Sequence, residues 1–342
     1  MEKANISRLS EIFGMKIIEG KPVASIGKEK FISKVELPVN ADAFIVHTPE
    51  AVEVASKPEI VGRELDSLIV EPARLTSTFL RRYLEPDNPI TFLHILRGSQ
   101  GYRLNMVLHD AGFDIKEQFV RVVYSGEGEK HSDSTPHVAR AQLSELSGKE
   151  KTLIVADTVA TGRTLIEALR IFFEFAQFKG AEFKRVLVYG FISEIGAGRI
   201  SDFLEKRDIE LALVSIEDFS ALSSNQYDMP LYGPDVTSKG VNVDRLIGGT
   251  TIPEAIEQMV KHYFPGSDQP GDWSERQCLL FNGSGYERGR IDRHLDNSLN
   301  ALEDLYSASR EAEWFESWME RIYMERKKGI VKAKSKDHCA PD

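Results

Sequence analysis

The stretch VADTVATGRT, at positions 155–164, holds residue types that bind phosphates and sugar hydroxyls. The apolar run TLIV ends at its first residue and the segment LIEALRIFF follows it, so the pattern predicts a turn from a strand into a helix. Such a turn gathers unpaired backbone N–H groups and the positive end of the helix dipole at one point, which favours an anion. An ordinary strand-to-helix turn would show the same pattern, so both interpretations stay open on this stretch alone.

The side chains of this stretch favour a ligand that carries both a phosphate and a ribose. Gly162 allows the backbone to approach an oxygen closely, and the hydroxyls of Thr161 and Thr164 are donors. Arg163 could add positive charge. Ionised Asp157 only accepts hydrogen bonds, so it suits a pair of sugar hydroxyls rather than a phosphate.

A second segment, ILRGSQGYR at 95–103, could bind a more highly charged anion. It joins the end of an apolar run to a loop with two glycines and one guanidinium, that of Arg97. Pyrophosphate carries several negative charges, and backbone N–H groups with an arginine match it well. This loop on its own would be weak evidence for such a site.

Alternating apolar strands and helical segments must position these two loops. Strands are predicted at 90–96, 119–125, 152–156, 185–192 and 209–216, and helices at 64–84, 100–112 and 165–180. Alternation of this kind predicts an α/β fold, a parallel sheet with helices on both faces. Open sheets of this class bind ligands at the carboxyl ends of their strands.

We expect three parts in the chain. Residues 1–60 form an N-terminal flanking region with strand-like runs, residues 61–240 form the α/β core, and residues 241–342 form a mostly helical C-terminal extension. Within the extension we expect a helix at 252–264, a Gly/Pro/Asp-rich linker at 265–272 and a long helical stretch from about 296 to 327. The extension would pack on the core or on a second subunit.

Composition narrows the classes of function. The 342 residues carry a formal net charge of −10 with no basic block, so nucleic acid is not an expected partner. No run of about 18 apolar residues occurs, so no membrane span is expected. Cys278 and Cys339 lie far apart in the sequence, make no metal-ligand pair and suit a reducing compartment without disulfides. Together with the absence of a signal-peptide core, this predicts a cytoplasmic protein.

TLIVADTVATGRT (152–164) resembles the thirteen-residue signature of the type I phosphoribosyltransferases, and ILRGSQGYR resembles the pyrophosphate loop of their uracil branch. A third segment, NQYDMPLYGPD at 225–235, resembles the base-recognition segment of that branch. The resemblance covers about residues 61–240 and implies the type I phosphoribosyltransferase fold. It implies catalytic roles for Asp157 and Arg97. It implies substrate contacts from three groups of residues: Ala160, Thr161, Gly162, Arg163 and Thr164; Gly98, Ser99, Gln100 and Gly101; Tyr227, Met229, Pro230, Gly233 and Asp235.

Two positions depart from the family pattern. Ala156 stands at the first of the two acidic positions of the signature, and Ser125 stands where the uracil branch has an arginine for pyrophosphate. Ala160 fills the position where purine enzymes often carry a carboxylate, and the uracil branch has alanine there as well. The segment GEGEKHSDS, 126–134, would be either a loop that closes over the substrate with Lys130 or His131, or a solvated turn.

The resemblance implies transfer of 5-phosphoribosyl from phosphoribosyl pyrophosphate to a nitrogen of a pyrimidine-like base or another heterocycle, with release of pyrophosphate. Mg²⁺ would be held through the donor, near Asp157, rather than by a direct protein site, and a homodimer is expected. The alternative is a non-catalytic sensor of phosphoribosyl pyrophosphate or a nucleotide on the same fold. Ala156 and Ser125 favour that alternative, because each removes a contact that a catalyst would use.

Overall fold

The computed structural model describes residues 3–84, 90–125, 134–144, 146 and 152–340. Its strands are β1 (Lys16–Ile17), β2 (Lys21–Ile26), β3 (Lys30–Val35), β4 (Asp42–His47), β5 (Ile90–Leu96), β6 (Ile115–Ser125), β7 (Thr135–Gln142), β8 (Thr152–Ala156), β9 (Arg185–Ser193), β10 (Glu210–Ser220), β11 (Tyr232–Thr237), β12 (Gly240–Gly248), β13 (Thr250–Thr251), β14 (Leu280–Phe281) and β15 (Tyr286–Glu287).

The α-helices are α1 (Lys3–Phe13), α2 (Pro49–Ser56), α3 (Gly62–Tyr83), α4 (Leu104–Asp110), α5 (Arg163–Lys179), α6 (Glu194–Glu205), α7 (Pro253–Met259), α8 (Ile291–Ser309) and α9 (Ser317–Ala333), and a short 3₁₀ turn, η1, covers Ser99–Tyr102. Across the described residues, no helix combines the length and the apolar character needed to cross a membrane.

The main sheet has the strand order β2-β3-β4-β10-β9-β8-β5-β6-β7. Neighbours from β4 to β6 in this order run parallel, whereas β2, β3 and β7 pair antiparallel at the two edges. This arrangement confirms the predicted α/β class with a mostly parallel sheet. The strands of residues 1–60 are part of this same sheet, because β4 pairs directly with β10.

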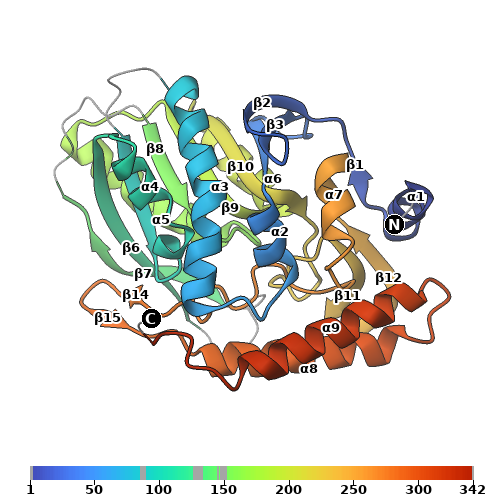
Figure 1. The fold of residues 1–342 in the computed structure, drawn as a ribbon. Helices are drawn as coiled ribbons and strands as arrows, with labels where there is room; N and C mark the ends of the chain where they lie inside the picture. Colours follow the sequence, from blue (N-terminus) through green and yellow to red (C-terminus); the bar gives the residue numbers. More distant parts are fainter. Residues whose placement is uncertain (1–2, 85–89, 126–133, 145, 147–151, 341–342) are drawn as a thin grey trace.

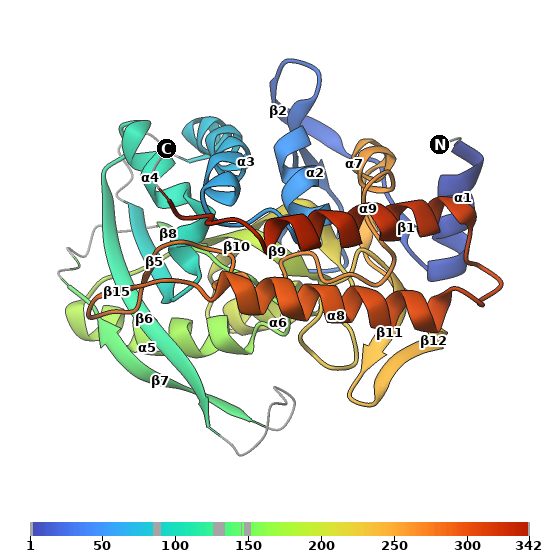
Figure 2. The same cartoon turned by 60° about the horizontal axis from the view of Figure 1, so that its bottom comes forward.

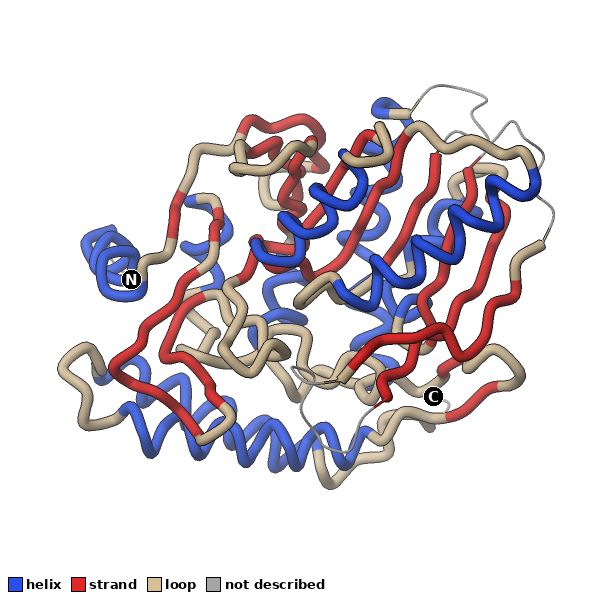
Figure 3. Tube along the Cα trace, turned by 180° about the vertical axis from the view of Figure 1, so that it is seen from behind, coloured by secondary structure: helices blue, strands red, loops and turns tan. Residues whose placement is uncertain are grey.

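Two apolar layers cover the faces of the sheet. Alternate residues of a strand point to opposite faces, and in β8 Ile154 and Ala156 belong to one layer while Leu153 and Val155 belong to the other. The first layer packs under α2, α3 and α4, which lie in front of the sheet in Figure 1. The second packs under α5 and α6, and Figure 3 shows that opposite face.

The long helical stretch that we predict at 296–327 is wrong in one respect, because the chain turns back within it. α8 ends at Ser309 and α9 begins at Ser317, and the two helices lie side by side as a hairpin (Figure 2). The aromatic residues of the turn explain the break. The ring of Trp314 packs edge-on against that of Phe13 of α1, with 5.1 Å between the ring centroids, and the ring centroid of Phe315 lies 6.4 Å from that of Phe264. Both residues lie in the turn between the two helices.

The prediction of two unpaired cysteines is also wrong, because Cys278 and Cys339 form a disulfide. The α8–α9 hairpin returns the C-terminal tail to the segment that follows residue 270, a closeness that separation along the chain does not reveal. The tail docks on the start of α3, where the backbone N–H of Arg63 donates to the carbonyl of His338 at 3.2 Å. The cysteines therefore no longer support a reducing compartment.

We expect the disulfide to stabilise the fold, because it closes a loop across 61 positions. Reduction should lower the free energy of unfolding by about 2–4 kcal/mol, measured by denaturant unfolding with and without a thiol reductant. Cys339→Ser is the matched control and should unfold identically with and without reductant. An unchanged midpoint for the unmodified chain under reduction would contradict this account.

Candidate functional site

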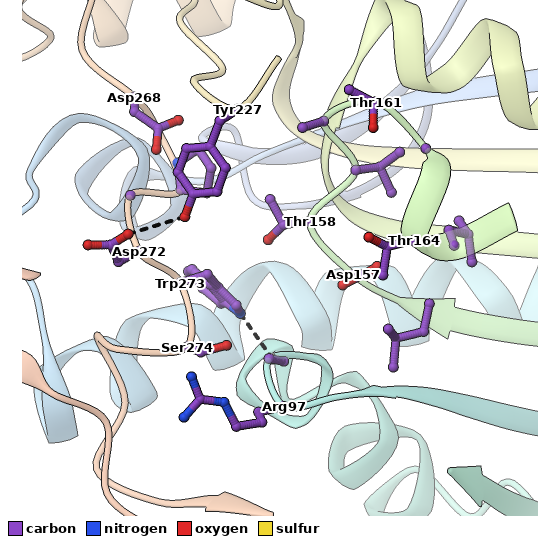
Figure 4. A pocket seen from close by; sticks show the side chains of 18 of the residues that line it. Arg97, Asp157, Thr158, Thr161, Thr164, Tyr227, Asp268, Asp272, Trp273 and Ser274 are labelled. Carbon is purple, nitrogen blue, oxygen red and sulfur yellow. Dashed lines mark hydrogen bonds between the residues drawn. The ribbon is translucent and has the colours of Figure 1, made fainter. Parts of the chain in front are cut away.

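A cavity of about 320 Å³ lies where the strand order of the sheet reverses direction (Figure 4). From β5 the chain passes to β6 on one side, and from β8 it passes to β9 on the other, while β5 and β8 are neighbours. The loops after these two strands must therefore separate, and a crevice opens between them. Both loops singled out in the sequence line this cavity, and two further segments, at 226–227 and 268–275, complete it.

Asp157 follows β8 directly and is fixed by its backbone. Its N–H donates to the carbonyl of Tyr189 at 3.0 Å, so the loop continues along β9 after the strand ends. Gly190 permits this approach, because a Cβ there would lie 2.2 Å from the carbonyl oxygen of Asp157. Burial raises the pKa of the Asp157 carboxyl to about 7, and only a hydrogen bond from the backbone of Thr158 opposes that effect. A carboxylate that burial destabilises in this way would gain from a ligand with hydroxyl groups or a cation.

The segment 158–164 leads from Asp157 into α5, as the sequence predicts. Gly162 precedes the helix with a φ of +75°, and Thr161 and Thr164 line the cavity beside it. The Thr164 hydroxyl shares a hydrogen bond of 2.7 Å with Tyr124 from β6. The first N–H groups of α5 have no carbonyl partner within the helix, and that of Arg163 donates to the Thr161 hydroxyl at 3.4 Å. The arrangement suits a phosphate group.

Arg97 lies across the cavity, at the end of β5, and two carboxylates hold it. Its guanidinium donates to Glu275 at 2.8 Å and to Glu287 at 2.6 Å. Burial raises the pKa of Glu275, but hydrogen bonds from Arg290 and from Arg97 outweigh it and lower that pKa to about 2. Glu275 is therefore ionised at every ordinary pH. The cation that we predict to bind pyrophosphate thus contacts anions of the protein itself.

Residues 268–275, here called the wall segment, close the cavity. The Trp273 ring stacks on Tyr102 at 4.4 Å, and its indole N–H donates to the carbonyl of Gly98 at 3.1 Å. The Tyr102 hydroxyl in turn shares a short hydrogen bond of 2.5 Å with Thr158. One aromatic pair therefore connects the loop after β5, the loop after β8 and the wall segment.

The same aromatic packing accounts for Ala156. The residue is fully buried and belongs to the apolar cluster that includes Tyr102, Tyr189 and Trp273. A carboxylate at this position would be buried in that apolar layer, at a high desolvation cost. A small apolar residue such as alanine therefore suits this buried position.

The structure brings some of the predicted site residues to the cavity and leaves others away from it. Those that line it are Arg97, Gly98, Asp157, Ala160, Thr161, Gly162, Thr164 and Tyr227; those that do not are Ser99, Gln100, Gly101, Arg163, Met229, Pro230, Gly233 and Asp235. Arg163 donates to the carbonyl of Ser134 at 2.5 Å. Asp235 is fully buried and accepts hydrogen bonds from the backbone N–H and the hydroxyl of Ser224. Residues 126–133, with Lys130 and His131, lie outside the described residues.

The contribution of the wall segment to the site is not predicted from the sequence, because most of this segment lies in the predicted linker at 265–272. The predicted linker at 265–272 contributes Asp268 and Asp272 to the cavity, and Tyr227 donates to Asp272 at 3.1 Å. Glu287 belongs to the glycine-rich segment 283–289 and reaches the site through Arg97. The available signal in the sequence is Trp273, directly after the Gly/Pro/Asp-rich linker, because a large aromatic residue is seldom left in solvent.

Comparisons with known proteins give no sequence family. No family model matches the chain, and no curated protein matches it. Among solved structures, the hypoxanthine-guanine phosphoribosyltransferase of L. donovani is 16% identical with a TM-score of 0.29, covering 47% of this chain and 83% of its own. The hypoxanthine phosphoribosyltransferase of Trypanosoma cruzi is 21% identical with a TM-score of 0.27, covering 40% of this chain and 73% of its own. That of Staphylococcus aureus is 14% identical with a TM-score of 0.29, covering 47% of this chain and 78% of its own. Likenesses this remote carry no argument about function.

We expect Asp157 to make stability depend on pH. Its pKa of about 7 in the fold exceeds the ordinary aspartate value, so the folded state keeps the proton to a higher pH than the unfolded state. The contribution of Asp157 to stability should therefore fall as pH rises from about 4 to about 7. Asp157→Asn should show a gain in melting temperature over the unmodified chain that grows across this range and then levels off. The exposed Asp110→Asn is the matched control, and an identical pH-dependent gain in both variants would contradict the assignment.

Proposed function

We propose that the chain binds phosphoribosyl pyrophosphate in this cavity and transfers its phosphoribosyl group to a nitrogen of a heterocyclic acceptor. The observation that supports this best is the meeting of the loops after β5 and β8 at one cavity, with Arg97 on one side and Asp157 with the start of α5 on the other. The start of α5 would hold the 5′-phosphate, Asp157 the ribose hydroxyls, and the Arg97 loop the pyrophosphate.

The reaction needs little from the protein beyond position and charge. The bond from C1 of the ribose to the pyrophosphate oxygen breaks and the leaving group takes both electrons. The acceptor nitrogen then forms the C1–N bond with its lone pair and loses its proton. Holding both ends of the donor fixed lowers the entropic part of the barrier. Charge that develops on the leaving pyrophosphate would be stabilised by Arg97 once its two carboxylate partners release it.

Asp268 is the group that we propose to take the acceptor's proton. Ala160 has no side chain for this purpose, whereas Asp268 lines the cavity from the wall segment, close to Tyr227 (Figure 4). Burial, and after it the charge of Asp228, raises the pKa of Asp268 well above that of an ordinary aspartate. A raised pKa brings a carboxylate into the range of an effective general base.

We propose that Mg²⁺ enters this site together with the donor. No group of three or more His, Cys, Asp or Glu side chains in the described part of the chain is arranged to hold a metal ion. Mg²⁺ commonly binds through one or two carboxylates together with substrate phosphates, and Asp157 offers one such carboxylate in the cavity. The ion would neutralise charge on the pyrophosphate. The homodimer, the cytoplasmic location and a pyrimidine-like acceptor stay predictions.

A sensor of the same donor is the second candidate, and the pairing of Arg97 supports it. Glu275 and Glu287 occupy the guanidinium that a catalyst would offer to pyrophosphate. Ala156 and Ser125 remove two further contacts that a catalyst would use. Binding without turnover would distinguish this candidate from the transferase.

Calorimetric titration with Mg²⁺ and phosphoribosyl pyrophosphate tests the proposal, followed by a pyrophosphate-release assay over a panel of nucleobases and other aromatic N-heterocycles. We expect saturable binding that Asp157→Asn weakens at least about tenfold, since a hydrogen-bonded charged group is lost. Release with one class of acceptor supports the transferase, and binding without release supports the sensor. Absence of binding to the unmodified chain would sink both candidates.

The carboxylates on Arg97 give a separate prediction. Glu275→Gln should strengthen pyrophosphate binding several-fold, because it removes an anion that competes for the guanidinium. Arg97→Met should weaken the same binding at least about tenfold. The exposed Glu311→Gln serves as the control that leaves the affinity unchanged. Weaker binding in Glu275→Gln would mean that Glu275 orients Arg97 rather than competing for it.

A further inference from the structure

A second, larger cavity of about 770 Å³ adjoins the first. Tyr227, Asp268, Gly271 and Asp272 line both, so the two cavities share one wall. The rest of the second cavity comes mainly from the strands β11 and β12 and from one side of α8. Most of these elements belong to the C-terminal extension, outside the region of resemblance. A role for the second cavity would therefore give the extension a part in binding.

The polar lining of the second cavity is strongly acidic. Asp228, Asp268, Asp272 and Asp304 supply carboxyl groups to it. The one cationic side chain among the described residues that line it is Arg326, which pairs with Glu59 at 2.8 Å. A ligand here would meet acceptor oxygens on most of its polar side, and burial raises the pKa of Asp228 and Asp268 and so favours the neutral form of these two groups. Such a lining selects ammonium groups and N–H donors and disfavours anions.

His294 adds an independent observation, since it is a fully buried side chain in this lining with an acceptor left over. Its Nε2 lies 2.9 Å from the carbonyl oxygen of Pro58, so the ring proton must be on Nε2. Its Nδ1 has no hydrogen-bond partner among the described residues. Burial, and then the charge of Arg276, lowers the pKa of His294 to about 4, so the ring is neutral near pH 7.

Gly271, a residue of the shared wall, packs closely against this imidazole. A Cβ at position 271 would lie 2.7 Å from Cε1 of His294 and 3.4 Å from its Nδ1. The backbone of Gly271 also has a φ of +58°, which side chains seldom adopt. A residue without a side chain thus stands where the shared wall passes against the imidazole of His294.

Apolar side chains also line the cavity. Val236 and Val241 come from the β11–β12 hairpin, and Ala301, Leu302 and Leu305 come from α8. A ligand that fills the space must therefore carry an apolar body as well as a donor-rich end. A simple nucleobase would find its place in the first cavity and leave this one unused.

We infer that the second cavity binds the part of the acceptor that lies beyond its reacting ring, and that this part is an apolar body with an ammonium group or several N–H donors. The inference that this ligand is part of the acceptor substrate rests on the proposed function, whereas the chemical class of the ligand follows from the lining of the cavity alone. A donor nitrogen of the ligand would meet Asp272 at the shared wall, while the apolar body packs along α8.

Three probes of nearly one shape test the ligand class: tryptamine, its neutral analogue tryptophol, and the anion indole-3-acetate. Binding to the full oxidised chain is measured by ligand-observed NMR and calorimetry. We expect affinity to fall from tryptamine to tryptophol to indole-3-acetate, with at least about a tenfold step between the first two. Asp272→Asn should remove most of that step, and Ala301→Trp should abolish tryptamine binding by filling the cavity. Asn300→Trp, on α8 but outside the lining, is the matched control.

Equal affinity for the three probes, a preference for indole-3-acetate, no binding of any probe, or tryptamine binding that survives Ala301→Trp would each overturn the inference. Binding of phosphoribosyl pyrophosphate to the unmodified chain is measured in parallel. Failure of that binding with tryptamine selectivity intact would remove the proposed function and leave the amine site standing. The reverse result would remove the amine site alone.

Discussion

One buried cation, Arg276, holds the parts of the site together. Its side chain is fully buried and its guanidinium donates to backbone carbonyls rather than to a carboxylate: those of Val54, Lys57 and Ile60 before α3, and those of Gln269 and Pro270 in the C-terminal extension. Burial lowers its pKa to about 10, so it stays charged near neutral pH. A buried charge needs its hydrogen bonds, and here those bonds connect segments more than 200 positions apart. These hydrogen bonds therefore fix the position of the wall segment relative to the sheet.

From this anchor the aromatic and charged contacts of the site follow. Trp273, three positions before Arg276, reaches the loop after β5 and stacks on Tyr102. Glu275, next to Arg276, reaches Arg97. The site thus combines a cradle for anions on the sheet side with carboxylates on the wall side. A donor with two phosphate ends must displace some of these carboxylates from Arg97, and so its binding is coupled to the position of the wall segment.

The sequence predicted the sheet and both of its ligand loops, because each strand is a short apolar run and each loop has glycine, hydroxyl or charged residues at fixed offsets. β5 and β8 match their predicted bounds, 90–96 and 152–156. Asp157 and Arg97 could be named because they directly follow those strands. Tyr227 is named from the resemblance of segment 225–235 to a base-recognition segment, which is also a local feature of the sequence. All of these signals lie within about ten residues of the feature that they predict.

The remaining features depend on contacts between distant segments, which no local pattern encodes. A linker-like composition at 265–272 gave no sign of Arg276 fixing the wall segment against α2 and α3. Separation in sequence argued against the pairing of Cys278 with Cys339, which the α8–α9 hairpin makes possible. Ala156 reads in the sequence as a lost acid, whereas the structure shows a fully buried small residue in the apolar layer that also contains Tyr102 and Trp273.

A crystal structure of the oxidised chain with Mg²⁺ and a carbocyclic analogue of phosphoribosyl pyrophosphate tests the central claim most directly. The account predicts the 5′-phosphate of the analogue at residues 160–164, its ring hydroxyls on Asp157, and its pyrophosphate on Arg97, with Glu275 moved off that guanidinium. An analogue bound elsewhere, or bound in the cavity with Arg97 still paired to both Glu275 and Glu287, would contradict it.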